Sequence, residues 1–188
     1  MKKVLYFPVL LVTFLLSFTI TSPVRASHGV GGEIFYTYIG PNQYLVTMKF
    51  YRDCFGINAP LSPIVCYQSA SLNQNGTITL TPIPGTGQPI PPSPCVPAAV
   101  TTCNGGNAYG VEEWVYTATV TLPAAAPDWI FSFEECCRNT QITNLLNGGG
   151  VGMYLSTNLD NANGLINSSP TFAQIPVTEF CVFNQFYF

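Results

Sequence analysis

Residues 129–144 place the tightest constraint on the fold, because an alternating strand there runs directly into two adjacent cysteines. The large apolar residues of this strand share one parity: Trp129, Phe131 and Phe133. Side chains on one face of a β-strand recur every second residue, so this spacing predicts a strand with one buried face. Because neighbouring strand residues point to opposite faces, we expect Cys136 and Cys137 to find partners on opposite sides of the sheet; a strained bond between the two is the alternative.

The same alternation recurs along most of the chain. It predicts further strands at 33–39, 43–53, 64–72, 77–82, 112–122 and 151–159, and one or two within 171–188. The Asn-Gln-Asn-Gly run at 73–76 predicts a hairpin turn, and the prolines and glycines of 83–110 predict a long surface loop. About eight short strands joined in this way favour an all-β fold, a disulfide-stapled immunoglobulin-like β-sandwich.

Residues 1–26 have the pattern of a secretory signal peptide. Lys2 and Lys3 precede an apolar run at 4–20, and small or apolar residues at 24 and 26 fit a cleavage site. A membrane anchor is the alternative, since the apolar run is borderline in length for spanning a bilayer. Cleavage leaves residues 27–188, a single β-sandwich domain, and we expect it to be secreted or held at the cell surface.

The charge balance of residues 27–188 argues against a nucleic-acid partner. The cations that remain after cleavage are Lys49, Arg52 and Arg138, against nine acidic residues, which gives a formal charge of −6. Three scattered cations form no basic stripe along which a phosphate backbone would bind.

All seven cysteines follow the leader: Cys54, Cys66, Cys95, Cys103, Cys136, Cys137 and Cys181. In an exported chain they predict disulfides. A zinc site is disfavoured, because the chain has no Cys-x-x-Cys pair and its one histidine, His28, is far from the cysteines in sequence. Spacing does not fix the connectivity.

Our working assignment of the disulfides joins Cys95 to Cys103, Cys54 to Cys66, and one of Cys136 or Cys137 to Cys181. Because seven is an odd number, at least one thiol is free or pairs outside the chain.

Candidates for catalysis are few. The pairs Glu112-Glu113 and Glu134-Glu135 offer carboxylates for acid–base chemistry or glycoside hydrolysis. Adjacent strand residues face opposite sides, so we expect these acids to be solvated or paired with cations. Neither His28 as a base nor one of the adjacent cysteines as a nucleophile is supported by a partner nearby in sequence.

Other residues suggest binding. Arg52 and Arg138 each lie beside a cysteine, where they either fix strand ends or line a ligand groove as a surface contact. The acid and amides of the 160–163 loop are weak candidates for Ca²⁺: Asp160, Asn161 and Asn163. Three tyrosines are candidates for stacking on sugar rings, or for packing on the second face of a sheet: Tyr36, Tyr38 and Tyr51.

Short motifs follow one another in a fixed order: Ser27-His28-Gly29, Gly31-Gly32-Glu33, Tyr51-Arg52-Asp53-Cys54, Thr101-Thr102-Cys103-Asn104-Gly105-Gly106, Asp128-Trp129-Ile130, Cys136-Cys137-Arg138-Asn139, Ile142-Thr143-Asn144 and Asn167-Ser168-Ser169-Pro170. This set resembles the N-terminal module of large exported cell-surface proteins of Bacteroidota, which are similar to gliding-motility-associated and adhesin-like proteins. The resemblance covers nearly the whole of residues 27–188. It implies an extracellular module followed by PKD-type or other immunoglobulin-like repeats and a sorting domain of the type IX secretion system.

Two departures from that pattern carry expectations of their own. Proteins of this kind often have a cysteine just before the Asp-Trp pair, where this chain has Ala-Ala-Ala-Pro at 124–127. Its loss implies that one of Cys136 or Cys137 is unpaired. The pattern also continues beyond Cys181 into further domains, so the resemblance implies that the sequence, which ends at Phe188, is the N-terminal fragment of a longer chain.

Three functions remain open. We favour a non-catalytic structural or adhesive module whose partners are further domains of the same protein, other surface proteins or glycans; we expect no cofactor, with Ca²⁺ as a weak alternative. A carbohydrate-binding module is the second. The third, an outer-membrane β-barrel, is suggested by alternating strands and by Phe186 and Phe188 at the end of the sequence, but the prolines and seven cysteines argue against a lipid-facing wall.

Overall fold

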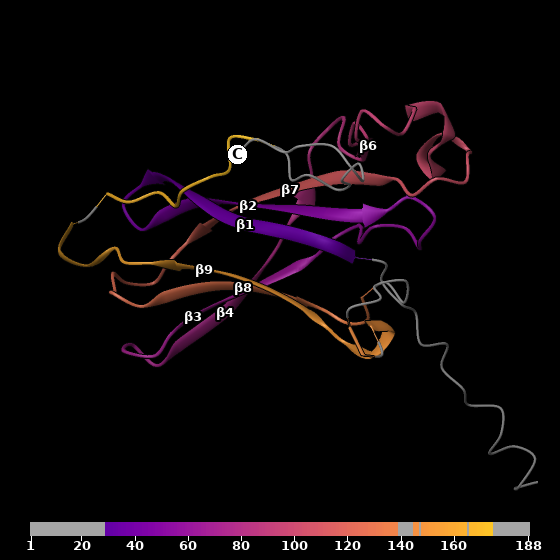
Figure 1. Ribbon diagram of the computed structural model, residues 1–188. Coiled ribbons are helices and arrows are strands. Elements are labelled where there is room, and N and C mark those ends of the chain that lie inside the picture. The colour runs from indigo at the N-terminus through magenta and orange to yellow at the C-terminus, as the bar shows by residue number, and fades with distance from the viewer. Residues whose placement is uncertain (1–28, 139–144, 147, 165, 175–188) are drawn as a thin grey trace, which may run out of the picture.

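The computed structural model describes residues 29–138, 145–146, 148–164 and 166–174. Two antiparallel sheets lie face to face and enclose one core, so the expected β-sandwich is confirmed (Figure 1). The part of the expected C-terminal strands that falls within residues 175–188 lies outside the described residues. Residues 171–174 form no strand.

The first sheet, sheet A, has the order β1-β2-β7-β5, with β6 also paired to β7. Its strands are β1 (Gly29–Gly40), β2 (Gln43–Asp53), β5 (Thr81–Pro82), β6 (Gln88–Pro89) and β7 (Val111–Thr121). The second sheet, sheet B, has the order β4-β3-β8-β9. Its strands are β3 (Ile64–Ser69), β4 (Gln74–Thr79), β8 (Trp129–Glu135) and β9 (Met153–Leu159).

Alternate residues of both sheets fill the core, as the sequence period predicts. The largest fully buried side chains are Trp129, Tyr36, Tyr44, Tyr116, Phe50 and Phe131. The rings pack at steep angles to one another: Tyr36 meets Tyr44 edge-on at 5.6 Å, and Phe50 meets Phe133 edge-on at 6.4 Å. Such contacts add to the area that the rings bury, so the aromatic core holds the two sheets together.

Loop 83–110 covers part of the outer face of sheet A. The predicted long loop is present, but it contains short regular elements: β6 and two 3₁₀ turns, Ala98–Val100 and Thr102–Asn104. Ile90 packs with Tyr51 and Val111 into a second, small core. The Pro/Gly-rich segment is therefore fastened to the sheet beneath it.

The hairpin turn between β3 and β4 is displaced from its predicted position. The turn lies at 70–73, where Asn73 N donates to Ala70 O, and β4 already begins at Gln74. Gly76, which the sequence places in the turn, lies within β4 under the ring of Tyr67; an added Cβ would stand 2.4 Å from that ring. The glycine serves close packing rather than the turn.

Asp128 fixes the displaced turn. Its carboxylate accepts hydrogen bonds from Ser69 Oγ at 2.6 Å, Ser71 N at 2.7 Å and Ser71 Oγ at 2.7 Å. These donors hold the pKa of Asp128 at about 2, because a hydrogen bond to a carboxylate favours its charged form.

Because the pKa of Asp128 is lower in the folded state than in the unfolded chain, the charged carboxylate stabilises the fold at pH values above its ordinary pKa near 4. This contribution is lost as the pH falls from about 4 to about 2. We therefore expect Asp128→Asn to lower the melting temperature most at neutral pH, with the difference from wild type shrinking towards pH 2. Circular dichroism melts across this range measure it. Ser69→Ala, which removes one donor, should give a smaller difference of the same shape; a difference that does not change with pH would contradict the assignment.

The disulfide pattern differs from our working assignment in every pair. Cys54 is bonded to Cys103, and Cys136 is bonded to its neighbour Cys137. Cys66 is free and exposed. The working assignment favoured cysteines close in sequence, whereas β2 and β7 run side by side and bring Cys54 to Cys103 across 49 positions.

The two adjacent cysteines do not point to opposite faces, because β8 ends at Glu135 and Cys137 has a left-handed backbone with φ of 73°. The unpaired thiol among the described residues is that of Cys66, and not of Cys136 or Cys137. Cys95 is disulfide-bonded, though not to Cys103. The expected role of Cys181 lies outside the described residues.

Candidate functional site

Both sheets end together at one pole of the sandwich, to which we give the name apical end. It comprises loop 54–63, residues 98–110 and the described residues between β8 and β9. Gly29, which opens β1, is so close to Met153, which opens β9, that an added Cβ would lie 3.5 Å from the methionine Cε. The loops that leave these strand ends gather on the right in Figure 1.

Arg52 anchors loop 54–63 from within. Its side chain is buried, and its Nη1 lies 2.5 Å from Glu112 Oε1. The rest of the guanidinium donates to backbone carbonyls of the loop: Nη2 to Gly56 O at 2.5 Å and Nε to Ile57 O. The planar fork of an arginine suits several acceptors at once, so one side chain fixes the loop to sheet A.

Two further restraints act on the same loop. Asp53 Oδ1 accepts a hydrogen bond from Phe55 N at 2.9 Å, and Asp53 O accepts one from Gly56 N at 2.9 Å. The bond between Cys54 and Cys103 ties the loop to residues 98–110. The backbone around Phe55 is therefore held by an ion pair, a side-chain cap and a covalent link.

The side chains that this loop presents are apolar and exposed. Phe55 is 78% exposed and Leu61 is 80% exposed. Other large apolar residues at the apical end are also exposed: Ile57, Ile64, Val100, Leu146 and Val151. Single exposed apolar residues are ordinary, but several at the same pole make this end a candidate contact surface.

A hollow of about 420 Å³ lies beside Phe55. Residues of β2, loop 54–63 and residues 98–110 line it: Asp53, Phe55, Thr102, Gly106, Asn107 and Tyr109. Thr102 Oγ1 is buried and has no hydrogen-bond partner among the described residues. The hollow thus combines aromatic residues with the amide of Asn107.

The acid pairs do not converge. Glu112 bonds to Arg52 and accepts Trp114 Nε1 at 2.5 Å, whereas Glu113 lies 3.5 Å from Lys49 Nζ on the other face of β7. Both acids are thus paired with cations, as the alternation of strand faces predicts.

Glu134 and Glu135 also divide between the two faces of their strand. Glu134 is exposed, and Glu135 is half-buried, where burial raises its pKa. His28, the candidate base, lies outside the described residues.

The arginines serve the structural role that we weighed against ligand binding. Arg52 is enclosed by its loop. Arg138 donates from Nη2 to Val30 O at 3.0 Å and from its backbone N to Val151 O at 2.9 Å. It therefore links the chain that follows β8 to β1 of sheet A and to the segment just before β9. The Arg52 guanidinium is enclosed, whereas Arg138 is half-buried and its buried Nε has no hydrogen-bond partner among the described residues.

The candidate calcium loop is bonded into the fold. Asn161 is buried, accepts Ala126 N at 2.8 Å and donates to Asn42 Oδ1 at 3.1 Å. Asp160 Oδ1 caps the turn at Ala162 N at 2.9 Å.

The three candidate tyrosines are not an exposed sugar platform. Tyr36 and Tyr51 are buried, and Tyr38 is half-buried against Tyr44 at 5.8 Å. The Tyr51 hydroxyl donates to Glu33 Oε1 at 2.5 Å, and burial followed by this bond raises its pKa.

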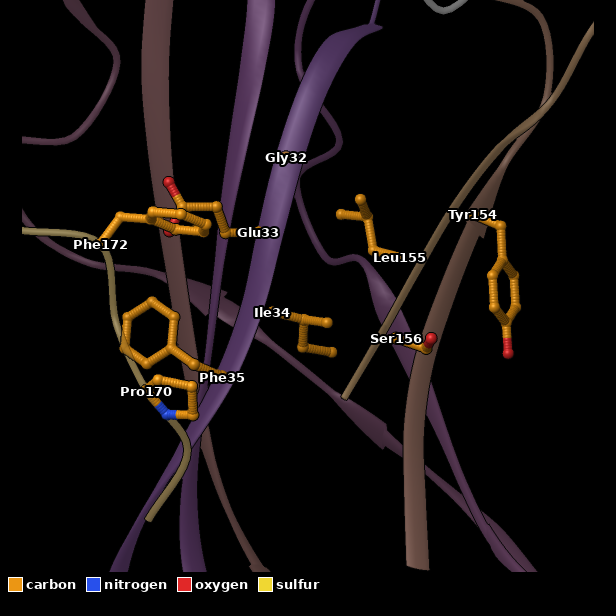
Figure 2. Close-up of a pocket in the computed structure, with 9 residues that line it drawn as sticks. All are labelled: Gly32, Glu33, Ile34, Phe35, Tyr154, Leu155, Ser156, Pro170 and Phe172. Atoms are coloured by element: carbon orange, nitrogen blue, oxygen red, sulfur yellow. The ribbon is translucent and has the colours of Figure 1, made fainter. Parts of the chain in front are cut away.

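A second hollow, of about 400 Å³, separates the edges of the two sheets (Figure 2). Residues 32–35 of β1 and 154–156 of β9 line it, together with Pro170 and Phe172. Figure 2 shows Pro170 and Phe172 beside β1, and Tyr154 and Ser156 on the opposite side. We name this hollow the edge groove.

The sequence did not identify Phe55 and Leu61 as functional residues. A usable signal was present, since Phe55 follows the Arg-Asp-Cys run directly and all three of those residues anchor its loop.

In the part of the chain that the structure describes, no helix is long and apolar enough to cross a membrane. That part also contains no group of three or more His, Cys, Asp and Glu side chains placed to hold a metal ion. No protein-family model matches the chain, and neither a curated protein nor a solved structure matches it.

Proposed function

We propose that this chain is a non-catalytic extracellular module of a bacterial cell-surface protein, with a structural and adhesive role. The observation that carries the proposal is the loop at Phe55, whose backbone is restrained three times while its apolar side chain is left 78% exposed. Restraints of this kind lower the entropy lost on binding. An aromatic side chain on a fixed loop is the type of group that anchors interfaces.

The origin of the module in a large exported Bacteroidota surface protein, secreted by the type IX system and linked to gliding motility, belongs to the same proposal. Its support is the ordered set of motifs along the chain. Many of these motif residues serve the apical end: Arg52, Asp53, Cys54 and Cys103 hold the loop, and Asn104 Nδ2 donates to Ala98 O at 2.8 Å.

Removing the apolar side chains from the loop tests the adhesive role. Beads coated with the exported protein are allowed to settle on methyl-silanised glass and on plain glass, and the detachment force is measured in flow. We expect Phe55→Ser with Leu61→Ser to lower the force several-fold on the methylated surface, because both side chains are exposed and the backbone at Phe55 is fixed.

The matched control is Ile39→Ser, an exposed apolar residue at the opposite pole of β1. Its detachment force should stay at the wild-type value. Equal losses in the control and in the loop variant would mean that adhesion depends on overall hydrophobicity, and the proposal would fail.

Carbohydrate binding is the second candidate, favoured by the hollow beside Phe55. Aromatic surface from Phe55 and Tyr109 and an amide from Asn107 are groups that hold a sugar ring. Binding on a glycan array that is lost in Asn107→Ala, with folding retained, would favour this candidate over hydrophobic adhesion.

A further inference from the structure

Strand β9 is an edge of sheet B that nothing in its own sequence protects. Natural edge strands are usually shielded by charges, prolines or bulges. The seven residues of β9, Met-Tyr-Leu-Ser-Thr-Asn-Leu, contain neither a charge nor a proline, and their register with β8 is unbroken. The edge of sheet A is different, because Tyr36 N and Tyr38 N of β1 donate to Ser169 Oγ and Ser168 Oγ.

The backbone groups of β9 that point away from β8 belong to alternate residues. Asn158 O accepts the Tyr36 hydroxyl at 3.0 Å, so this carbonyl is turned away from β8. In an antiparallel ladder both polar groups of a residue point to the same side, and the side alternates along the strand. The N–H and C=O groups of Tyr154 and Ser156 therefore also point outward, where another strand would meet them.

The edge groove lies beside such a strand, and Ile34, Leu155 and Phe172 give it some apolar surface next to Glu33 and Ser156. Residues 166–172 run past β1, and Phe172 in this segment is 74% exposed beside Pro170 (Figure 2). On the β9 side, Leu155 points towards β1, where an added Cβ on Gly32 would lie 2.7 Å from its Cδ1. A strand added beside β9 would have its inner side chains over the groove and would bury Phe172.

We propose that the added strand is β9 of a second copy, paired antiparallel about a two-fold axis at Ser156. The pairing places Ser156 opposite Ser156, Tyr154 opposite Asn158, Leu155 opposite Thr157 and Met153 opposite Leu159. These pairs use the outward N–H and C=O groups of Tyr154 and Ser156 and the N–H of Asn158, whose carbonyl already accepts the Tyr36 hydroxyl. The strand is self-complementary because every pair is uncharged, so two copies of an acidic chain meet without local repulsion.

The test is sedimentation velocity over a concentration series, with the full sequence expressed for export. Cys66→Ser serves as the background, because the free, exposed thiol of Cys66 would otherwise form covalent dimers. We expect a reversible dimer in this background. Ser156→Lys should weaken it about tenfold or more, since two lysines would face one another at the axis and like charges directly opposite are destabilising.

Two variants make the result specific. Ser156→Pro removes the outward N–H without adding a charge, and should also weaken the dimer. Thr77→Lys places the same charge on the exposed residue of the other edge strand, β4, and should leave it intact. A background protein that stays monomeric at its highest soluble concentration, a dimer that survives Ser156→Pro, or a dimer lost equally in Thr77→Lys would each overturn the proposal.

Discussion

Replacing Cys54 and Cys103 together by serine is expected to lower the free energy of unfolding by about 4 kcal/mol, the value for a disulfide that closes a loop of this length. The bond spans 49 positions and joins the end of β2 to the loop before β7. Without it, the unfolded chain gains conformational freedom that the folded chain lacks. Urea unfolding monitored by tryptophan fluorescence measures the change.

The control for the disulfide is Cys66→Ser, which removes an exposed thiol that forms no disulfide. It should change the unfolding free energy by no more than about 0.5 kcal/mol. Peptide mapping without reductant should recover Cys54 linked to Cys103 in the wild type. A double variant as stable as Cys66→Ser, or a map that links Cys54 to Cys66, would contradict the assignment.

Arg52→Ala should cost about 3 kcal/mol, because removing one partner of a buried pair leaves the other charge uncompensated. The Arg52 and Glu112 side chains are only 9% and 15% exposed. Glu112 keeps its bond from Trp114 Nε1, which places the cost at the lower end of the range for such pairs. The variant also frees the carbonyls of Gly56 and Ile57, so the loop at the apical end should lose its fixed shape.

The half-buried ion pair on the other face of β7 is the matched comparison. Lys49 and Glu113 are 3.5 Å apart, with side chains 22% and 21% exposed. Lys49→Ala should cost less than Arg52→Ala, because the Lys49–Glu113 pair is longer and more accessible to solvent than the Arg52–Glu112 pair. Chemical denaturation of both variants under one set of conditions compares their losses of unfolding free energy directly. Equal losses would show that the burial of Arg52 does not increase its contribution to stability.

The strands of this protein could be predicted because each follows a local rule. The β2 face that carries Val46, Met48 and Phe50 is the buried face, and the threonines of β7 lie on the other side of their strand. Even the separation of Glu112 from Glu113 follows from the pleat alone. Errors arose where a residue served a distant neighbour, as Gly76 does by making room for Tyr67.

The candidate sites were harder to predict for a similar reason. Tyr36 and Phe55 are both aromatic residues in the sequence, yet one is 2% exposed and the other 78% exposed. Their difference depends on which loops cross the ends of the sheets and which strands face one another. No spacing within β1 or loop 54–63 contains that information.

The all-β class and the faces of the long strands could be predicted from the sequence, because the alternation of apolar and polar residues is a local pattern. The presence of disulfides could be predicted from the number of cysteines that follow the leader. The three-dimensional arrangement was needed to show that Cys54 meets Cys103, that Arg52 faces inward, and that β9 is the last strand of sheet B among the described residues. The physical reason is that partner choice, burial and edge position are properties of strand order. Strand order is set by the packing of the two sheets against each other, which joins residues far apart in the chain.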